Sequence, residues 1–265
     1  MSRIDTVFGR LRTRRETGLV TYVTAGDPDL ERSAAILRTL DTSGADILEV
    51  GVPFSDPLAD GPVIQRASER ALSAGATLAK TLDLIGTIRS AVRAAVVLFT
   101  YANPVLRMGV ERFMRRASEV GVDGLLMLDL PIEEATGLRQ QAVSAGLDPI
   151  FLLSPTTTDA RMRRAGELGR GFLYGISRLG VTGERDRLAD GAQELVSRIR
   201  ASTELPVALG FGISRPEHVR QVGQWADAAV VGSGLVSVIA RAAASPALLD
   251  EVSGYVRWLK SGQPA

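Results

Sequence analysis

The sequence predicts one eight-stranded β/α barrel, a (β/α)8 or TIM barrel, formed by all 265 residues as a single domain 1–265. Short aliphatic or β-branched runs alternate with longer amphipathic stretches, and this alternation occurs eight times without a linker or low-complexity tract. Strands alternating with helices form right-handed βαβ units and a parallel sheet. Eight such units in this length fit a closed barrel better than an open doubly wound sheet.

Each expected strand is a short apolar run, and each expected helix is a longer stretch with apolar residues at helical spacing. The expected strands are residues 19–24, 46–52, 95–101, 124–128, 149–153, 171–175, 206–210 and 228–232. The expected helices between them are residues 30–42, 67–73, 78–91, 110–119, 133–145, 159–168, 192–201 and 216–221. Additional N-terminal and C-terminal helices, at residues 3–15 and 246–260, are expected to cap the barrel.

The composition is that of an ordinary soluble globular protein, with 45% hydrophobic and 23% charged residues and a formal net charge of +1. This charge gives no electrostatic signature of binding to nucleic acid or to an anionic membrane. No apolar run is long enough to span a bilayer, and residues 1–15 are too charged for a signal peptide. We therefore expect a cytoplasmic location.

The rare residue types exclude several kinds of chemistry. The chain has no cysteine and one histidine, His218, so thiolate chemistry and multi-histidine metal centres are excluded and no metal site is expected. The only lysines, Lys80 and Lys260, lie in helix-like stretches, which argues against a Schiff base. His218 falls in a helix start, where a surface or capping role is expected. Carboxylates or tyrosines must then carry any acid–base chemistry near neutral pH.

Residues 48–62, LEVGVPFSDPLADGP, place the carboxylate of Glu49 in an apolar strand. Burying an ionised group is costly unless it is paired. Alternation puts Glu49 on the face opposite its neighbours Leu48 and Val50, which is the barrel interior if those residues face the helices. The stiff loop that follows could hold Asp60 as a second carboxylate. Alternatively, Glu49 bonds a polar group of a neighbouring strand, and the aspartates cap turns or the next helix.

Two glycine-containing segments follow the last two expected strands, at residues 209–214, LGFGIS, and 231–234, VGSG. Glycines let backbone N–H groups approach an anion, and a helix N-terminus favours negative charge. Barrels of this class commonly bind phosphate after strands seven and eight. The sequence therefore predicts a phosphate site, although the glycines could simply end strands, with Ser214 and Ser233 capping helices.

A third segment, residues 174–183, YGISRLGVTG, follows the sixth expected strand. Its length and its glycines suit a lid that closes over the site and excludes water. It could equally be a long surface connection.

These motifs closely resemble those of the tryptophan synthase α subunit family. The resemblance covers nearly the whole chain, in the family's order and spacing. It is carried by residues 22–28 (YVTAGDP), 49–62, 101–104 (YANP), 177–183 (SRLGVTG) and 210–214 (GFGIS).

The resemblance implies a carbon–carbon lyase that cleaves indole-3-glycerol phosphate to indole and glyceraldehyde 3-phosphate. This retro-aldol reaction uses neither a metal nor a Schiff base. Glu49 is implied to remove the proton from the glycerol hydroxyl next to the indole and to help protonate the ring carbon. Asp60 is implied to accept a hydrogen bond from the indole N–H, and Tyr174 is implied to stand beside Glu49.

The resemblance also implies the residues that bind the substrate. The implied positions are Tyr22, Ile64, Phe99, Leu126 and Val230 at or near the indole pocket, and Gly183, Gly212, Gly232 and Ser233 for the phosphate, with Phe211 and Ile213 close by. Thr182 is implied to belong to the lid and to contact Asp56 on closure. Tyr22 and Phe99 stand where other members carry different apolar or aromatic residues, which affects the shape of the pocket.

A partner is implied as well, a β subunit that contains PLP and receives indole through a tunnel in an αββα heterotetramer. The chain itself is expected to hold no cofactor. The Asp56 loop, the Thr182 lid and residues 101–107 are expected to lie toward this partner. Three alternatives stay open: a standalone indole-3-glycerol-phosphate lyase, another phosphate-binding barrel enzyme such as an isomerase, and a catalytically inactive barrel that acts as an allosteric subunit.

Overall fold

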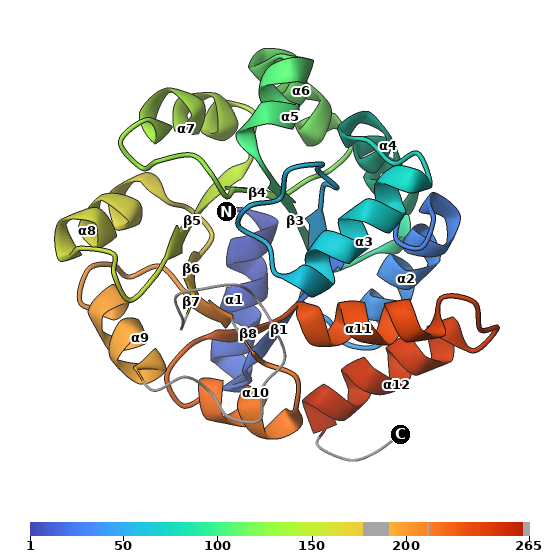
Figure 1. The fold of residues 1–265 in the computed structure, drawn as a ribbon. Helices are drawn as coiled ribbons and strands as arrows, with labels where there is room; N and C mark the ends of the chain where they lie inside the picture. The colour runs from blue at the N-terminus through green and yellow to red at the C-terminus, as the bar shows by residue number, and fades with distance from the viewer. Residues whose placement is uncertain (177–190, 211, 262–265) are drawn as a thin grey trace.

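Eight parallel strands form a closed barrel in which each strand pairs with the next in the chain and β1 pairs with β8 (Figure 1). The computed structural model describes residues 1–176, 191–210 and 212–261. The strands are β1 (Gly18–Thr24), β2 (Ile47–Gly51), β3 (Ala95–Thr100), β4 (Gly124–Met127), β5 (Asp148–Leu153), β6 (Leu173–Ile176), β7 (Val207–Gly210) and β8 (Ala228–Val231). The predicted barrel is confirmed.

Helix α1 (Arg3–Arg14) lies across one end of the barrel and the other helices surround it, as Figure 1 shows. The others are α2 (Leu30–Thr42), α3 (Pro62–Ser73), α4 (Leu78–Ile88), the 3-10 turn η1 (Arg89–Ala91), α5 (Ala102–Met108), α6 (Val110–Glu119), α7 (Ala135–Ser144), α8 (Asp159–Leu168), α9 (Ala192–Arg200), α10 (Pro216–Val222), α11 (Ser233–Ala242) and α12 (Leu248–Ser261). Within the described ranges, none of these helices has the length and apolar character needed to cross a membrane.

The largest differences from the sequence prediction are one helix start and two additional helices. Helix α3 begins at Pro62 rather than at residue 67, because proline is well suited to the first turn of a helix. Helix α5 was not predicted, since it is short and contains Pro104, which a first turn tolerates. Helix α11 was not predicted either. Its apolar residues outnumber its polar ones, and three of the buried ones, Val236, Val238 and Ile239, are β-branched, a composition that is also typical of strands.

The strand residues divide between two apolar cores according to their alternation. In β2, Leu48 and Val50 belong to the outer core between the strands and the helices. Ile47 belongs to the inner core within the barrel. Glu49 therefore points into the barrel, as the alternation predicted, because successive strand side chains point to opposite faces.

Helix α1 closes one end of the barrel interior. Its buried residues Ile4, Val7, Phe8 and Leu11 belong to the inner core, and the Phe8 ring lies 5.7 Å from that of Phe172. Figure 1 shows this helix across the centre of the barrel. Helix α12 does not cap the barrel as expected; it packs outside, against α2, α10 and α11. One end of the barrel is thus filled by apolar side chains, and the opposite end remains for a site.

Candidate active site

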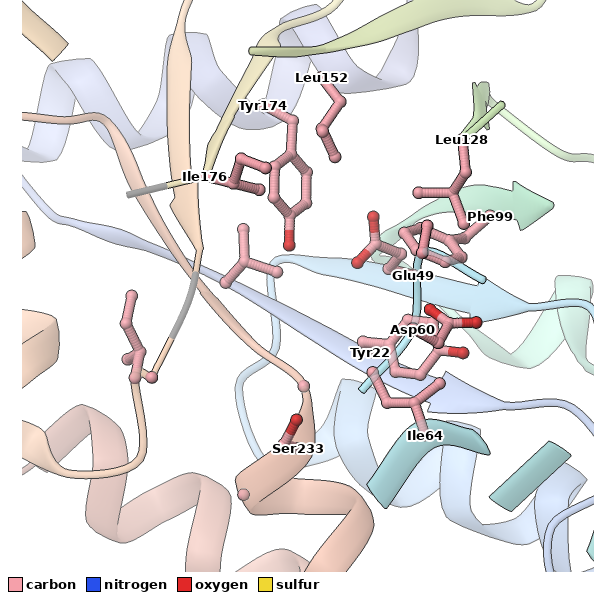
Figure 2. Close-up of a pocket in the computed structure, with 16 residues that line it drawn as sticks. Tyr22, Glu49, Asp60, Ile64, Phe99, Leu128, Leu152, Tyr174, Ile176 and Ser233 are labelled. Atoms are coloured by element: carbon pink, nitrogen blue, oxygen red, sulfur yellow. The ribbon is translucent and has the colours of Figure 1, made fainter. Parts of the chain in front are cut away.

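A cavity opens where the carboxyl ends of the strands meet, and most of the predicted site residues line it (Figure 2). The predicted residues on its wall are Tyr22, Glu49, Asp60, Ile64, Phe99, Tyr174, Gly212, Ile213, Val230, Gly232 and Ser233. The wall also contains five residues that sequence reasoning missed, Ala59, Leu128, Leu152, Ile176 and Gly234. Barrel enzymes carry their active sites at this end.

The other predicted residues do not line the cavity or cannot be placed. Leu126 is fully buried in the inner core and is not among the lining residues. Asp56 is exposed, and its carboxylate accepts a hydrogen bond from Ser55 Oγ over 2.5 Å. Thr182, Gly183 and Phe211 lie outside the described residues, so the expected lid and its contact with Asp56 are not described.

Glu49 is a buried carboxyl without the compensating bond that a structural role would require. It is 1% exposed, and its Oε1 atom has no hydrogen-bond partner. Glu49 Oε1 therefore does not bond a polar group of a neighbouring strand, contrary to the structural alternative. Burial, and then the nearby charge of Asp60, raises the pKa of Glu49 to about 8. A carboxyl with this pKa can both donate and accept a proton near neutral pH.

Asp60 reaches the same cavity from the loop after β2, and its carboxylate is held by a tyrosine. The hydroxyl of Tyr101 donates to Asp60 Oδ2 over 3.1 Å. The same hydroxyl accepts from the backbone N–H of Ala59 over 3.0 Å. Burial raises the pKa of Asp60 to about 6, and the hydrogen bond from Tyr101 opposes this rise. The N-cap of α3 is Gly61, with no side-chain cap bond, so Asp60 does not cap that helix.

The two carboxyls thus differ in their acid–base properties because their surroundings differ. Glu49 Oε1 has no hydrogen-bond partner, whereas Asp60 accepts a hydrogen bond from Tyr101. Between about pH 6 and about pH 8, their pKa values favour a protonated Glu49 beside an ionised Asp60. Such a pair separates the role of proton donor from the role of fixed negative charge.

Two tyrosines, Tyr22 and Tyr174, lie near Glu49 (Figure 2). Each ring lies over a glycine in a neighbouring strand. The Tyr22 ring occupies the space that a side chain at Gly51 would need, and the Tyr174 ring does the same at Gly210. Burial raises the pKa of both phenols well above the ordinary value, assisted by the charge of Asp60 at Tyr22 and of Glu49 at Tyr174. Both tyrosines therefore remain neutral and shape the cavity around Glu49.

Backbone of the glycines that follow β7 and β8 forms one wall of the cavity. Gly212 has a φ of +77°, a conformation that favours glycine. Helix α11 begins at Ser233, and its N-cap Gly232 provides no side-chain bond. Neither Ser214 nor Ser233 is therefore an N-cap. The N-cap of α10 is Arg215, whose side chain makes no capping hydrogen bond. Ser233 and the N-terminus of α11 face the cavity instead, where they suit an anion.

Two residues outside the predicted set support this site. Tyr101 donates a hydrogen bond to Asp60. The only sequence signal for Tyr101 was its position in the YANP motif at residues 101–104. His218 is buried rather than on the surface, so the surface alternative was wrong. Its Nδ1 accepts from the backbone N–H of Ser214 over 3.3 Å, a bond of the capping kind. Among the described residues, no group of three or more histidines and carboxylates could hold a metal ion.

Comparison with protein families identifies one family over most of the chain. A family model described as "Tryptophan synthase alpha chain" matches residues 8–260. A curated protein named tryptophan synthase alpha chain from Geotalea uraniireducens is 47% identical over 265 residues, which cover 100% of this chain and 99% of that protein. The protein of the same name from Prochlorococcus marinus is 48% identical over 252 residues, covering 95% of this chain and 91% of that protein.

Solved structures of the same family share the fold. A structure of Mycobacterium tuberculosis tryptophan synthase matches with a TM-score of 0.91 and 38% identity, covering 100% of this chain and 99% of that one. A crystal structure of tryptophan synthase subunit alpha from Legionella pneumophila matches with a TM-score of 0.89 and 37% identity, covering 98% and 97% of the two chains. The likeness extends over the barrel and its additional helices.

Proposed function

The chain belongs to the tryptophan synthase alpha chain family, and we propose that its barrel cavity cleaves indole-3-glycerol phosphate to indole and glyceraldehyde 3-phosphate. The observation that carries this proposal is the buried Glu49 carboxyl, which has an unpartnered oxygen and lies in one cavity with Asp60 and the glycine segments. This arrangement supplies a proton carrier, a fixed negative charge and an anion site. A retro-aldol cleavage of a phosphorylated substrate needs these three elements.

In the first step, Glu49 acts as a general acid. Its protonated carboxyl transfers the proton to the indole ring carbon that bears the glycerol chain, and the ring becomes a positively charged indolenine. Asp60 accepts a hydrogen bond from the ring N–H and stabilises this positive charge. The pKa of about 8 for Glu49 and of about 6 for Asp60 supports this division of roles at neutral pH.

In the second step, Glu49 is a carboxylate and acts as a general base. It removes the proton from the hydroxyl on the carbon attached to the ring. A C=O double bond forms on that carbon while its bond to the ring breaks, and the bonding electrons return to the ring. Indole and glyceraldehyde 3-phosphate are released, and Glu49 is protonated again. The cycle uses no oxidant, reductant or metal, which agrees with the residues available in the chain.

The walls of the cavity suit the two ends of this substrate. Ile64, Phe99 and Val230 provide apolar contacts for the indole ring, and the Phe99 ring lies edge-on to that of Tyr22 at 5.1 Å. Backbone at Gly212 and Gly232 and the hydroxyl of Ser233 provide donors for the phosphate. Gly183, Phe211 and Thr182 complete the proposed binding set from segments outside the described residues. Leu126 supports the indole pocket from the inner core.

Membership of the family implies a β-subunit partner, and we propose an αββα heterotetramer in which that partner holds PLP and receives the indole. Two exposed leucines support a contact surface at this rim of the barrel. Leu58, in the Asp56 loop, is 90% exposed, and Leu106, in α5, is 64% exposed. Tyr101 joins these segments: its hydroxyl accepts from Ala59 N–H, and its ring packs on Phe54 at 5.2 Å.

Indole release from indole-3-glycerol phosphate by the purified chain tests the proposed chemistry. We expect Glu49→Gln to lower kcat by about 10³-fold or more, the scale of general acid–base catalysis, while the circular dichroism spectrum stays that of the wild type. Asp60→Asn should also be severely impaired. Arg116→Met, at an exposed ion pair far from the cavity, serves as the control and should keep full activity. Full activity in Glu49→Gln would refute the mechanism.

The family relationship does not favour a standalone lyase or an inactive scaffold barrel. Adding a tryptophan synthase β subunit separates these possibilities. We expect a large acceleration of indole release by the wild type, because contact with the partner at the rim of the barrel stabilises the closed, catalytically competent site. No change on addition would indicate a standalone lyase. No cleavage under either condition would indicate an inactive barrel.

A further inference from the structure

Ser214 is the last residue of the first glycine segment, residues 209–214, and side chains bond both of its backbone polar groups. Its N–H donates to His218 Nδ1 over 3.3 Å, and its carbonyl accepts from the hydroxyl of Tyr255 over 3.0 Å. Gly212 and Ile213, which immediately precede Ser214, line the cavity, whereas Ser214 does not. Two hydrogen bonds made just outside the cavity therefore hold the residue that follows Gly212 and Ile213.

The Tyr255 hydroxyl also touches the second glycine segment. A Cβ atom at Gly234 would overlap the Tyr255 oxygen and would lie 3.3 Å from Ser214 Cβ. Gly234 lies in the first turn of α11 and lines the cavity. One phenol oxygen thus lies between the segment after β7 and the helix that begins after β8, which are the two halves of the proposed phosphate site.

Tyr255 comes from α12, a helix that contributes no residue to the cavity wall. The Tyr255 ring packs on that of Trp258 at 5.7 Å, which restrains the hydroxyl. Helix α12 is fixed elsewhere by Lys260, whose ammonium contacts Asp46 Oδ2 at 2.9 Å, and by Ser253, whose hydroxyl bonds that of Ser43 over 2.9 Å. The Tyr255 phenol is therefore held in place by a helix outside the barrel that other contacts fix.

We propose that Tyr255, together with His218, is a positioning residue that sets the spacing between the two glycine segments and thereby the affinity for the phosphate group. This inference rests on the proposed function, since it concerns the phosphate end of that site. Neither side chain touches the substrate. Backbone donors bind an anion well only when they converge on it, so a small shift of one segment weakens binding at this end alone.

The variant Tyr255→Phe tests the proposal, because it removes the hydroxyl and keeps the ring that packs on Trp258. We expect the KM for indole-3-glycerol phosphate to rise about fivefold, the effect of losing one net hydrogen bond, with kcat changed less than twofold. The dissociation constant for inorganic phosphate should rise by the same factor, while that for indole stays unchanged. His218→Leu, which removes the acceptor at similar volume, should act in the same direction.

Ser253→Ala is the matched control, since it removes a different hydrogen bond of α12 and leaves Tyr255 in place. It should not change phosphate affinity, even where it lowers the melting temperature as much as Tyr255→Phe does. The proposal is wrong if Tyr255→Phe leaves phosphate affinity unchanged, or weakens phosphate and indole equally. If the wild type binds no inorganic phosphate, the proposed phosphate site is wrong. If the wild type and Tyr255→Phe bind phosphate equally well, only the positioning role of Tyr255 is wrong.

Discussion

The hydroxyl of Tyr101 donates to Asp60 Oδ2 over 3.1 Å while it accepts from the N–H of Ala59, so one phenol fixes both the carboxylate and the backbone of its loop. Tyr101→Phe removes these bonds and keeps the ring against Phe54. Because the lost bond opposes the rise in the pKa of Asp60, we expect the acid limb of the kcat/KM profile to move to higher pH. We also expect kcat to fall about tenfold, the effect of one charge-assisted hydrogen bond. An unchanged profile with reduced stability would assign Tyr101 a purely structural role.

The proposed order of proton transfers predicts a bell-shaped dependence of kcat/KM on pH. Activity should fall below about pH 6 as Asp60 is protonated, and above about pH 8 as Glu49 loses its proton. The alkaline limb is the diagnostic one, because the substrate phosphate also titrates near pH 6. Initial rates of indole release between pH 5 and pH 10 measure this profile. A plateau above pH 8 would mean that Glu49 begins the cycle as a carboxylate.

The buried carboxyl of Glu49 should destabilise the fold at alkaline pH. Its folded pKa of about 8 lies above the ordinary value of 4.5, so its contribution to stability is lost as the pH rises from about 4.5 to about 8. We expect Glu49→Gln to be more stable than the wild type at pH 8.5, by a few kcal/mol at about 1.4 kcal/mol per pKa unit. The difference should shrink toward pH 5. Urea unfolding at both pH values measures it, and equal stabilities at pH 8.5 would contradict the prediction.

The ion pair of Arg70 with Asp27 should contribute far more to stability than an exposed pair of the same length. The Arg70 guanidinium donates to both oxygens of Asp27, at 2.8 and 2.7 Å, and Asp27 is 3% exposed. Arg70→Met leaves a buried carboxylate unpaired, so we expect a loss of about 3 kcal/mol. The control is Arg116→Met, whose partner Asp83 is exposed, and it should cost less than about 1 kcal/mol. Equal losses in urea unfolding would contradict this difference.

The barrel and the direction of Glu49 could be predicted because both follow from local periodicity. Alternation along β2 separates Leu48 and Val50 from Glu49, and the closed sheet then places the carboxylate inside. The helices α5 and α11 were not predicted, since one is short with an early proline and the other is rich in buried β-branched residues. Helix α11 packs against β1 and α12, and α5 packs against α6, and such contacts decide the conformation more than the local pattern does.

The supporting contacts of the site could not be predicted, because they join residues far apart in the chain. Tyr101 lies 41 residues from Asp60, and Tyr255 lies 41 residues from Ser214. A sequence pattern reports periodicity and turn chemistry, but it does not report which hydroxyl meets which carbonyl. His218 illustrates the same limit: its place in a helix start predicted capping, whereas its burial depends on the neighbouring elements.

The pairing of β1 with β8 and the insertion of α1 into the barrel interior have a consequence for assembly on the ribosome. The first helix and the first strand emerge early, yet their partners include Ala228, Val230 and other residues near the end of the chain. Until those residues have been made, β1 exposes an unpaired edge and α1 has no completed interior to fill. The newly made chain therefore carries exposed apolar surface for most of its synthesis, a period in which chaperones are most useful.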